Sequence, residues 1–240
     1  MRRETQNILL ILLGGALLKI ALNGDYLRYV KPSQQPWVIA GGAAMVLLGG
    51  IAVVRDVLAA RRAEPAGVPG DDCHDHPARS AWLLMVPVLA VFLVAPPALG
   101  ADSVARNEAR APEVTRGASF PPLPPGEVVP LAVSQFVTRA GWDAAGTLNG
   151  RTVSMTGFVV RDGRDVLLAR MVISCCAADA FPVTVRLTGE PRAAELPVDT
   201  WIEVTGQYVP GPQQRRPGHA PELAVTTLRE TPAPPDPYEY

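Results

Sequence analysis

The sequence has few of the residues on which disulfide-stabilised or nucleic-acid-binding proteins depend. It contains three cysteines among 240 residues, a number that excludes a fully paired disulfide framework. It also has no excess of positive charge, with 22 basic and 23 acidic residues. From Glu127 onward there are 13 acidic residues, 10 arginines and no lysine. A basic surface for phosphate backbones is therefore missing, and we expect no nucleic-acid partner.

Signatures of thiol-redox and hydrolytic catalysis are missing as well. No C-x-x-C pair occurs, and His219 stands alone in a stretch rich in proline and glycine. No nucleophile, base and orienting group are found together in the sequence. We therefore expect a protein that is not an enzyme.

Three long apolar runs occupy most of the first hundred residues. They are Ile8–Leu22, which is interrupted only by Lys19, Trp37–Val54 with 18 uncharged residues, and Ala81–Ala101 with 21. A helix that crosses a bilayer needs about 20 such residues, and none of the runs has the polar stripe of a soluble amphipathic helix. The sequence predicts a membrane domain over residues 1–101, with transmembrane helices at about 5–22, 37–58 and 81–101.

Loop charges favour a cytoplasmic N-terminus, because cytoplasmic loops carry the excess of lysine and arginine. With the N-terminus inside, six cations lie in the cytoplasm and five on the opposite face. The six are Arg2, Arg3, Arg55, Arg61, Arg62 and Arg79. We therefore expect a multi-pass protein of the cytoplasmic membrane whose C-terminal domain lies outside the cytoplasm.

The second half of the chain predicts a linker followed by a β-rich domain. Residues 102–130 are rich in proline and alanine and are typical of a linker. Residues 131–240 begin with a plausible short helix, Leu131–Ala145, and continue with five runs of period two, the mark of half-buried strands. The runs are Arg151–Val160, Asp165–Ser174, Phe181–Gly189, Thr200–Val209 and Glu222–Glu230.

Two of these runs carry patterns that, taken together, are typical of small barrels. G-R-x-V-x-x-x-G-x-V is followed later by W-I-x-V-x-G-x-Y, and Gly157 and Gly206 would let their strands bend sharply. The pattern favours an OB-like barrel. The expected fold class is thus membrane-anchored α + β, with three N-terminal transmembrane helices followed by a small C-terminal β-barrel.

Two groups of residues are candidate metal ligands. In the predicted loop between the second and third helices, Cys73, His74 and His76 stand among aspartates in "DDCHDHP". This mixture of soft and borderline ligands suits zinc, copper or nickel. The spacing favours a flexible, exchangeable site over a rigid structural one, and the alternative is a polar loop whose composition has no meaning.

The second group is Cys175 and Cys176 with Asp179, in "VISCCAADAFPV". Three roles are open for the pair. It could bind a soft or borderline metal ion such as zinc, alone or with an imidazole such as that of His219. It could cycle to a vicinal disulfide as a redox element, or consist of two small buried hydrophobic residues.

Several segments resemble the YcgQ-like family of bacterial membrane proteins, described as subunits of a two-component permease. They are "NGDYLRYVKP", the His/Asp loop, "GFV" at 157–159, "LARMVISCCAADAFPVTV", "DTWIEVTG" and "PPDPYEY". "ISCCAADA" is the most specific of them. Relatives often carry a longer run of His and Asp in the loop, where this chain has only "CHDH".

The resemblance implies association with a separate multi-helix permease that moves a small or metal-related solute. The residues agree with an accessory role, because three helices without a charged residue at mid-membrane make a poor transport path. We expect a non-catalytic accessory subunit whose exported domain contacts a metal ion or small solute. The alternatives are a metal-binding sensor or delivery protein and a thiol-redox membrane protein.

Overall fold

The computed structural model of the chain describes residues 3–62, 86, 89–90, 93, 97–107, 109, 120–211 and 220–240. These residues form two compact units. The first consists of Met1–Tyr26 and Pro32–Pro97, and the second consists of Leu27–Lys31 and Ala98–Tyr240. The short connection at residues 27–31 therefore belongs to the second unit, although it is covalently joined to the first at both ends.

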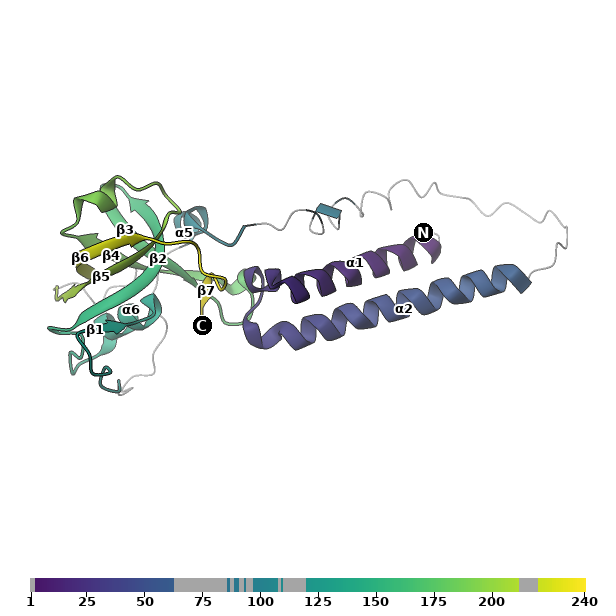
Figure 1. Cartoon of the computed structure of the whole chain (residues 1–240), viewed down its shortest axis with the longest axis horizontal. Coiled ribbons are helices and arrows are strands. Elements are labelled where there is room, and N and C mark those ends of the chain that lie inside the picture. The colour runs from purple at the N-terminus through teal and green to yellow at the C-terminus, as the bar shows by residue number, and fades with distance from the viewer. Residues whose placement is uncertain are drawn as a thin grey trace. The chain divides into compact units, whose positions relative to one another are not determined.

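The first unit contains two long apolar helices that pack side by side (Figure 1). Helix α1 spans Arg3–Asn23 and α2 spans Gln35–Arg62, with the short 3-10 helices η1 (Asp25–Arg28) and η2 (Pro32–Gln34) between them. Both are long and apolar enough to cross a membrane. Only 22% of the apolar window in α1 and 11% of that in α2 is buried. A core helix of a soluble protein would be covered, so the exposure favours a lipid environment.

Glycines allow α1 and α2 to approach closely. A Cβ at Gly14 would lie 2.7 Å from the carbonyl oxygen of Gly42, and one at Gly49 would lie 2.6 Å from Cγ1 of Ile11. These glycines serve the contact between the two helices, as small residues do in membrane helix pairs. Gly15, Gly41 and Gly50, by contrast, have open space where a Cβ would be, with no neighbouring atom of a described residue within 4 Å.

The predicted third helix at 81–101 falls mainly outside the described residues. The first two predicted spans are confirmed as helices. Of the third, the structure describes only a few separate residues and the final stretch 97–101, where α5 begins.

The second unit is a mixed α+β domain with a seven-stranded sheet (Figure 1). In chain order its helices are α5 (Ala101–Arg106), α6 (Val133–Trp142), and the 3-10 helices η3 (Ala177–Asp179) and η4 (Pro191–Ala194). Its strands are β1 (Val128–Pro130), β2 (Thr152–Asp162), β3 (Asp165–Val172), β4 (Phe181–Thr188), β5 (Trp201–Val209), β6 (Glu222–Glu230) and β7 (Tyr238–Glu239).

The order of pairing is β1-β2-β5-β6-β4-β3-β7, with a further pairing of β2 with β3. Five strands are therefore linked in a cycle from β2 through β5, β6, β4 and β3 back to β2. All pairs in the cycle are antiparallel except β4 with β6. Short β1 and β7 add parallel pairs outside the cycle.

The five long strands form where the sequence predicts them, and both faces of the sheet are covered at β3, whereas one face of β5 and β6 is partly exposed. On one face a cluster of buried apolar side chains from β2–β6 packs with Phe136 and neighbouring residues of α6. On the other face Ala101 and Val104 of α5 cover Phe158 and Met171. Strand β3 is buried on both faces, which explains why its sequence is mostly apolar, with Arg170 as a buried exception, and lacks the clean period of two expected for it.

Gly157 and Gly206 lie where neighbouring backbone comes very close. A Cβ at Gly157 would be 2.6 Å from the carbonyl oxygen of Ala169. A Cβ at Gly206 would overlap the carbonyl oxygen of Ala224. The pairing of β5 with β6 shifts register between Thr205 and Gly206. The register shift agrees with the predicted local irregularity at Gly206.

The predicted linker at 102–130 is shorter at both ends than the sequence indicates. Helix α5 occupies its beginning, where the N–H of Ala101 donates to Asp199 Oδ1 at 2.7 Å, and β1 occupies its end. Six residues of helix and three of strand are too short to show a period, so composition alone suggested an unstructured segment.

Candidate functional site

The candidate site is a tight turn that follows β3 and is organised by Asp179. The Asp179 carboxylate accepts the backbone N–H of Ser174 and that of Cys175, each at 2.8 Å. The backbone N–H of Asp179 donates to the carbonyl oxygen of Cys176 at 3.0 Å. An aspartate that binds nearby backbone groups in this way stabilises a turn, so the position of the carboxylate is fixed beside the two cysteines.

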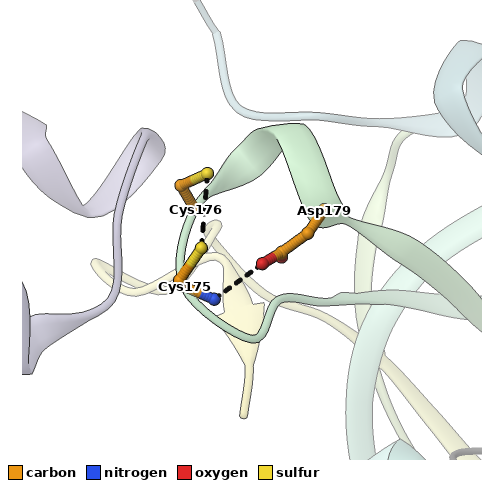
Figure 2. Close-up of side chains that lie close together, drawn as sticks. All are labelled: Cys175, Cys176 and Asp179. Atoms are coloured by element: carbon orange, nitrogen blue, oxygen red, sulfur yellow. Dashed lines mark hydrogen bonds between the residues drawn. The ribbon is translucent and has the colours of Figure 1, made fainter.

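Both cysteines are free thiols, and their sulfur atoms face each other (Figure 2). The Sγ–Sγ distance is 3.7 Å. One ligand atom each from Cys175, Cys176 and Asp179 lies within 4.8 Å of the other two. Cys175 is exposed and Cys176 is partly buried, so the cysteines are not both packed in the core as inert hydrophobic residues.

The electrostatics of the turn keep Cys175 protonated. A hydrogen-bond interaction with the Asp179 carboxylate, followed by one with Cys176, raises the pKa of the Cys175 thiol to about 11. The pKa of Asp179 responds to two opposite effects. Desolvation raises it, but hydrogen bonds from the Cys175 thiol and from backbone N–H groups lower it further, so that the pKa lies below its usual value. In the absence of a metal ion the turn therefore combines a neutral thiol with a carboxylate. A neutral thiol is a poor nucleophile.

The distance between the sulfur atoms fits one type of ligand well. Zinc–thiolate bonds of about 2.3 Å at a tetrahedral angle place two sulfur atoms about 3.8 Å apart, close to the observed 3.7 Å. A linear two-coordinate ion with the same bond length would need about 4.6 Å, and a disulfide needs about 2.05 Å. The Sγ–Sγ distance is thus compatible with a tetrahedral ion, although it is also the distance of the contact between the two thiols.

The backbone of the turn is also paired with the connection between α1 and α2. Val30 lies opposite Cys176 in an isolated antiparallel bridge. The N–H of Ala177 donates to the carbonyl oxygen of Tyr29 at 2.7 Å, and the N–H of Lys31 donates to that of Cys175 at 3.4 Å. All of these residues belong to the second unit.

A second polar cluster, at the C-terminal tail, is buried. The side chains of Arg170 and Glu239 are 9% and 10% exposed, with 3.5 Å between Arg170 Nε and Glu239 Oε1. The Glu239 carboxylate accepts the N–H of Val133 at 2.9 Å and that of Ser134 at 2.7 Å, at the beginning of α6. The guanidinium lies 4.9 Å from the centre of the Trp201 ring.

Of the predicted site residues, the structure brings Cys175, Cys176 and Asp179 together. Cys73, His74, His76 and the isolated His219 lie outside the described residues, so their predicted role stays a prediction. Sequence reasoning missed the supporting role of residues 29–31 and of the C-terminal tail. A pairing between residues nearly 150 positions apart leaves no local pattern.

Comparison with known proteins finds a domain family in the second half of the chain. No curated protein matches the chain. Residues 143–240, which contain β2–β7, the cysteine turn and the C-terminal tail, match the DUF1980 C-terminal domain, a domain of unknown function.

Proposed function

We propose that the protein is a membrane-anchored, non-catalytic accessory subunit of a permease, and that its β-domain binds a soft or borderline divalent metal ion. The observation that carries the metal-binding role is the grouping of two thiols and a carboxylate within 4.8 Å. Because the thiolate is both the nucleophile and the metal ligand, the raised pKa of Cys175 means that zinc must displace a proton from this thiol and that zinc affinity should increase with pH.

Zinc is the ion that this ligand set suits best. Thiolate and carboxylate are both zinc ligands, and the spacing of the sulfur atoms fits a tetrahedron. The described residues supply three ligands at the turn, which leave one tetrahedral position open, whereas structural zinc sites take four. The turn is therefore suited to an ion that is exchanged with a solute or a partner.

Metal analysis of the full chain tests this role. We expect the C73A/H74A/H76A variant, in which the candidate loop ligands are removed, to retain about one zinc ion per chain. Adding C175S/C176S should remove that ion, because both thiolates are lost. If stoichiometry is the same with and without Cys175 and Cys176, the turn is not the metal site.

The contacts of residues 27–31 support three membrane crossings. These residues join α1 to α2 and belong to the same compact unit as residues 98–240. If α1 and α2 each cross the bilayer, this connection and the β-domain lie on one side, and α2 ends on the other. The chain must then cross again before Ala98, which agrees with the apolar run at 81–101.

The charge distribution supports an outside location for the β-domain, with the N-terminus in the cytoplasm. Labelling of Cys175 from each side of intact cells, with C73S/C176S as the background, tests the orientation. A membrane-impermeant maleimide added from outside should label Cys175 at high pH, where the thiolate forms. Labelling only after permeabilisation would overturn the proposed orientation.

The cycle of five strands supports an OB-type barrel. Around the cycle the order of the strands is β2, β3, β4, β6, β5. The parallel pair joins β4 to β6, which are the third and the fifth of the five strands in chain order. Such barrels often bind oligonucleotides, but the acidic balance after Glu127 does not favour that ligand. Fold alone does not set the function, and the cysteine turn supplies a different chemistry.

The accessory role rests on the resemblance to YcgQ-like proteins and on the composition of the two described helices. Lys19 lies near the end of α1, and the charged residues of α2 are Arg55 and Asp56 near its end with the arginines that follow. No charged group within the middle of either described helix is available to relay ions. Gly15, Gly41 and Gly50, which have open space around them, would allow close approach of partner helices.

Co-purification tests the partnership. The chain should co-purify from detergent with a co-expressed neighbour-encoded permease of many helices. Substituting Gly15, Gly41 and Gly50 by leucine should weaken the complex, whereas the purified chain should keep its fold. A clean monomer in native mass spectrometry, with the permease present, counts against the role.

A further inference from the structure

The backbone of the cysteine turn is held from two directions. From within the turn, Asp179 binds the N–H groups of Ser174 and Cys175. From the connection between α1 and α2, Tyr29 and Lys31 bind the N–H of Ala177 and the carbonyl oxygen of Cys175. The candidate ligands and residues 29–31 therefore share the same short piece of backbone.

We propose that residues 29–31 position the metal site, so that ion binding and the order of this connection are linked. The proposal rests on the metal-binding function proposed above and names how that site is regulated. It predicts that binding of the metal ion increases the order of residues 29–31, the segment that connects the two apolar helices.

The physical reason is the cost of ordering. An ion that joins Cys175, Cys176 and Asp179 restricts the turn from Ser174 to Asp179. When Tyr29 and Lys31 already hold that backbone, less conformational entropy is lost on binding. Because linkage is reciprocal, an ion that favours the paired state also stabilises the pairing of residues 29–31.

Residues 29–31 follow Arg28, which is attached to the C-terminal tail independently of the cysteine turn. The Tyr238 hydroxyl donates to the carbonyl oxygen of Arg28 at 3.0 Å and accepts the N–H of Leu99 at 3.2 Å. Neither bond involves the turn, so this attachment does not depend on metal. Residues 29–31, which follow this attachment, are the part whose order responds to the ion.

Hydrogen exchange on the full chain with C73A/H74A/H76A, which removes the candidate loop ligands, tests the link directly in detergent micelles with and without Zn²⁺; this chain is the parent for every comparison below. Peptides that cover residues 29–31 and 175–179 should both gain protection when Zn²⁺ binds. The peptide that contains Leu99 should exchange equally in both conditions and serves as the internal control.

Ala177→Pro removes one bond of the pairing without touching a ligand. Proline has no N–H, so the 2.7 Å bond to Tyr29 is lost. Ala177 is the first residue of η3, a position that accepts proline, and Cys176 has the extended backbone (φ −155°, ψ 168°) that proline requires of the residue before it. Ala177→Ser keeps the N–H and is the matched control.

Zinc affinity should fall about fivefold in A177P, the change expected for one neutral hydrogen bond, with stoichiometry unchanged. A177S should bind as the parent does. The zinc-dependent protection of residues 29–31 should be reduced in A177P, where the bond from Lys31 N–H to Cys175 remains, and kept in A177S.

Each outcome has a distinct meaning. Zinc binding without added protection at residues 29–31 overturns the link and leaves the metal site standing, and so does equal affinity in folded A177P and A177S. If A177P does not fold, the exchange experiment on the parent decides alone. Failure of the parent to bind zinc overturns both the link and the metal function.

Discussion

The two polar clusters near the end of β3 differ in how far their side chains are exposed to solvent. Arg170 lies within β3 and is buried with Glu239, while Cys175 lies three residues beyond the strand and is exposed. Glu239 accepts two backbone N–H groups and lies beside the guanidinium. Arg170 also donates to the carbonyl oxygen of Tyr238 at 3.1 Å.

The difference separates a structural role from a binding role. In the buried cluster, Arg170 and Glu239 form an ion pair and each also binds backbone groups, although Arg170 Nε has no hydrogen-bond partner among the described residues. Burial lowers the pKa of Arg170, while the charge of Glu239 opposes that change. In the turn, the two thiols interact with each other and with Asp179, and the Cys175 side chain is exposed to solvent. A ligand is therefore expected at the turn and not at the buried pair.

Breaking the buried pair should have the largest effect. Arg170→Ala leaves the Glu239 carboxylate buried without its cation, and loss of one partner of a buried ion pair costs about 3–5 kcal/mol of unfolding free energy. Denaturant unfolding of the full chain in detergent, followed by tryptophan fluorescence, measures the change.

The exposed pair of Arg229 and Glu203 supplies the control. These side chains are 75% and 37% exposed, so Arg229→Ala should cost less than about 1 kcal/mol. Equal losses in the two variants would contradict the contrast between buried and exposed clusters.

Prediction from sequence succeeded where the determining signal is local. The apolar runs identified α1 and α2 by their length, and the period-two run at Glu222–Glu230 coincides with β6. Cys175, Cys176 and Asp179 could be grouped in advance because they lie within five residues of each other. A single turn brings such residues together whatever the rest of the fold does.

Prediction failed where distant segments meet. Strand β7 has two residues and β1 has three, too few for a period to be visible. Glu239 binds the beginning of α6 from 106 positions away, and Tyr29 binds Ala177 from the connection between the two apolar helices. Such contacts depend on how strands and tail are arranged in space, which a single sequence does not reveal through periodicity or spacing.

The hydroxyl of Tyr238 should have an intermediate effect. It is buried and bridges Arg28 and Leu99, and burial raises its pKa, so it remains a donor at neutral pH. Tyr238→Phe leaves both backbone groups without this partner and should cost about 1–3 kcal/mol. Thermal unfolding of the full chain in detergent measures the loss.

Tyr240→Phe is the matched control in the same tail. Its hydroxyl donates to the Asp236 carboxylate at 2.6 Å, but Tyr240 is 54% exposed. Water can replace that bond, so the variant should unfold close to the wild type. A larger loss for Y240F than for Y238F would show that the bridge between Arg28 and Leu99 contributes little.

The smallest expected effect concerns the reactivity of the exposed turn. Asp179→Asn preserves the size of the side chain and an oxygen acceptor but removes the charge that keeps the Cys175 thiol neutral. The pKa of Cys175 should fall from about 11 toward the ordinary value of 9.0. At pH 8 the thiolate fraction rises, although each thiolate becomes less nucleophilic as its pKa falls. The net gain in alkylation rate is about threefold for each unit by which the pKa falls.

Iodoacetamide labelling of Cys175 measures this rate when C73S/C176S is the background, since one thiol then remains. The rate should level off at a lower pH in D179N than in the C73S/C176S parent, because the Asp179 carboxylate is the largest cause of the raised Cys175 pKa and the parent retains it. Asp102→Asn, at an exposed aspartate in α5, should leave the profile unchanged. If D179N reacts no faster than the parent at pH 8, the Asp179 carboxylate does not hold the thiol neutral. The contrast between the turn and the buried cluster would then rest on exposure alone.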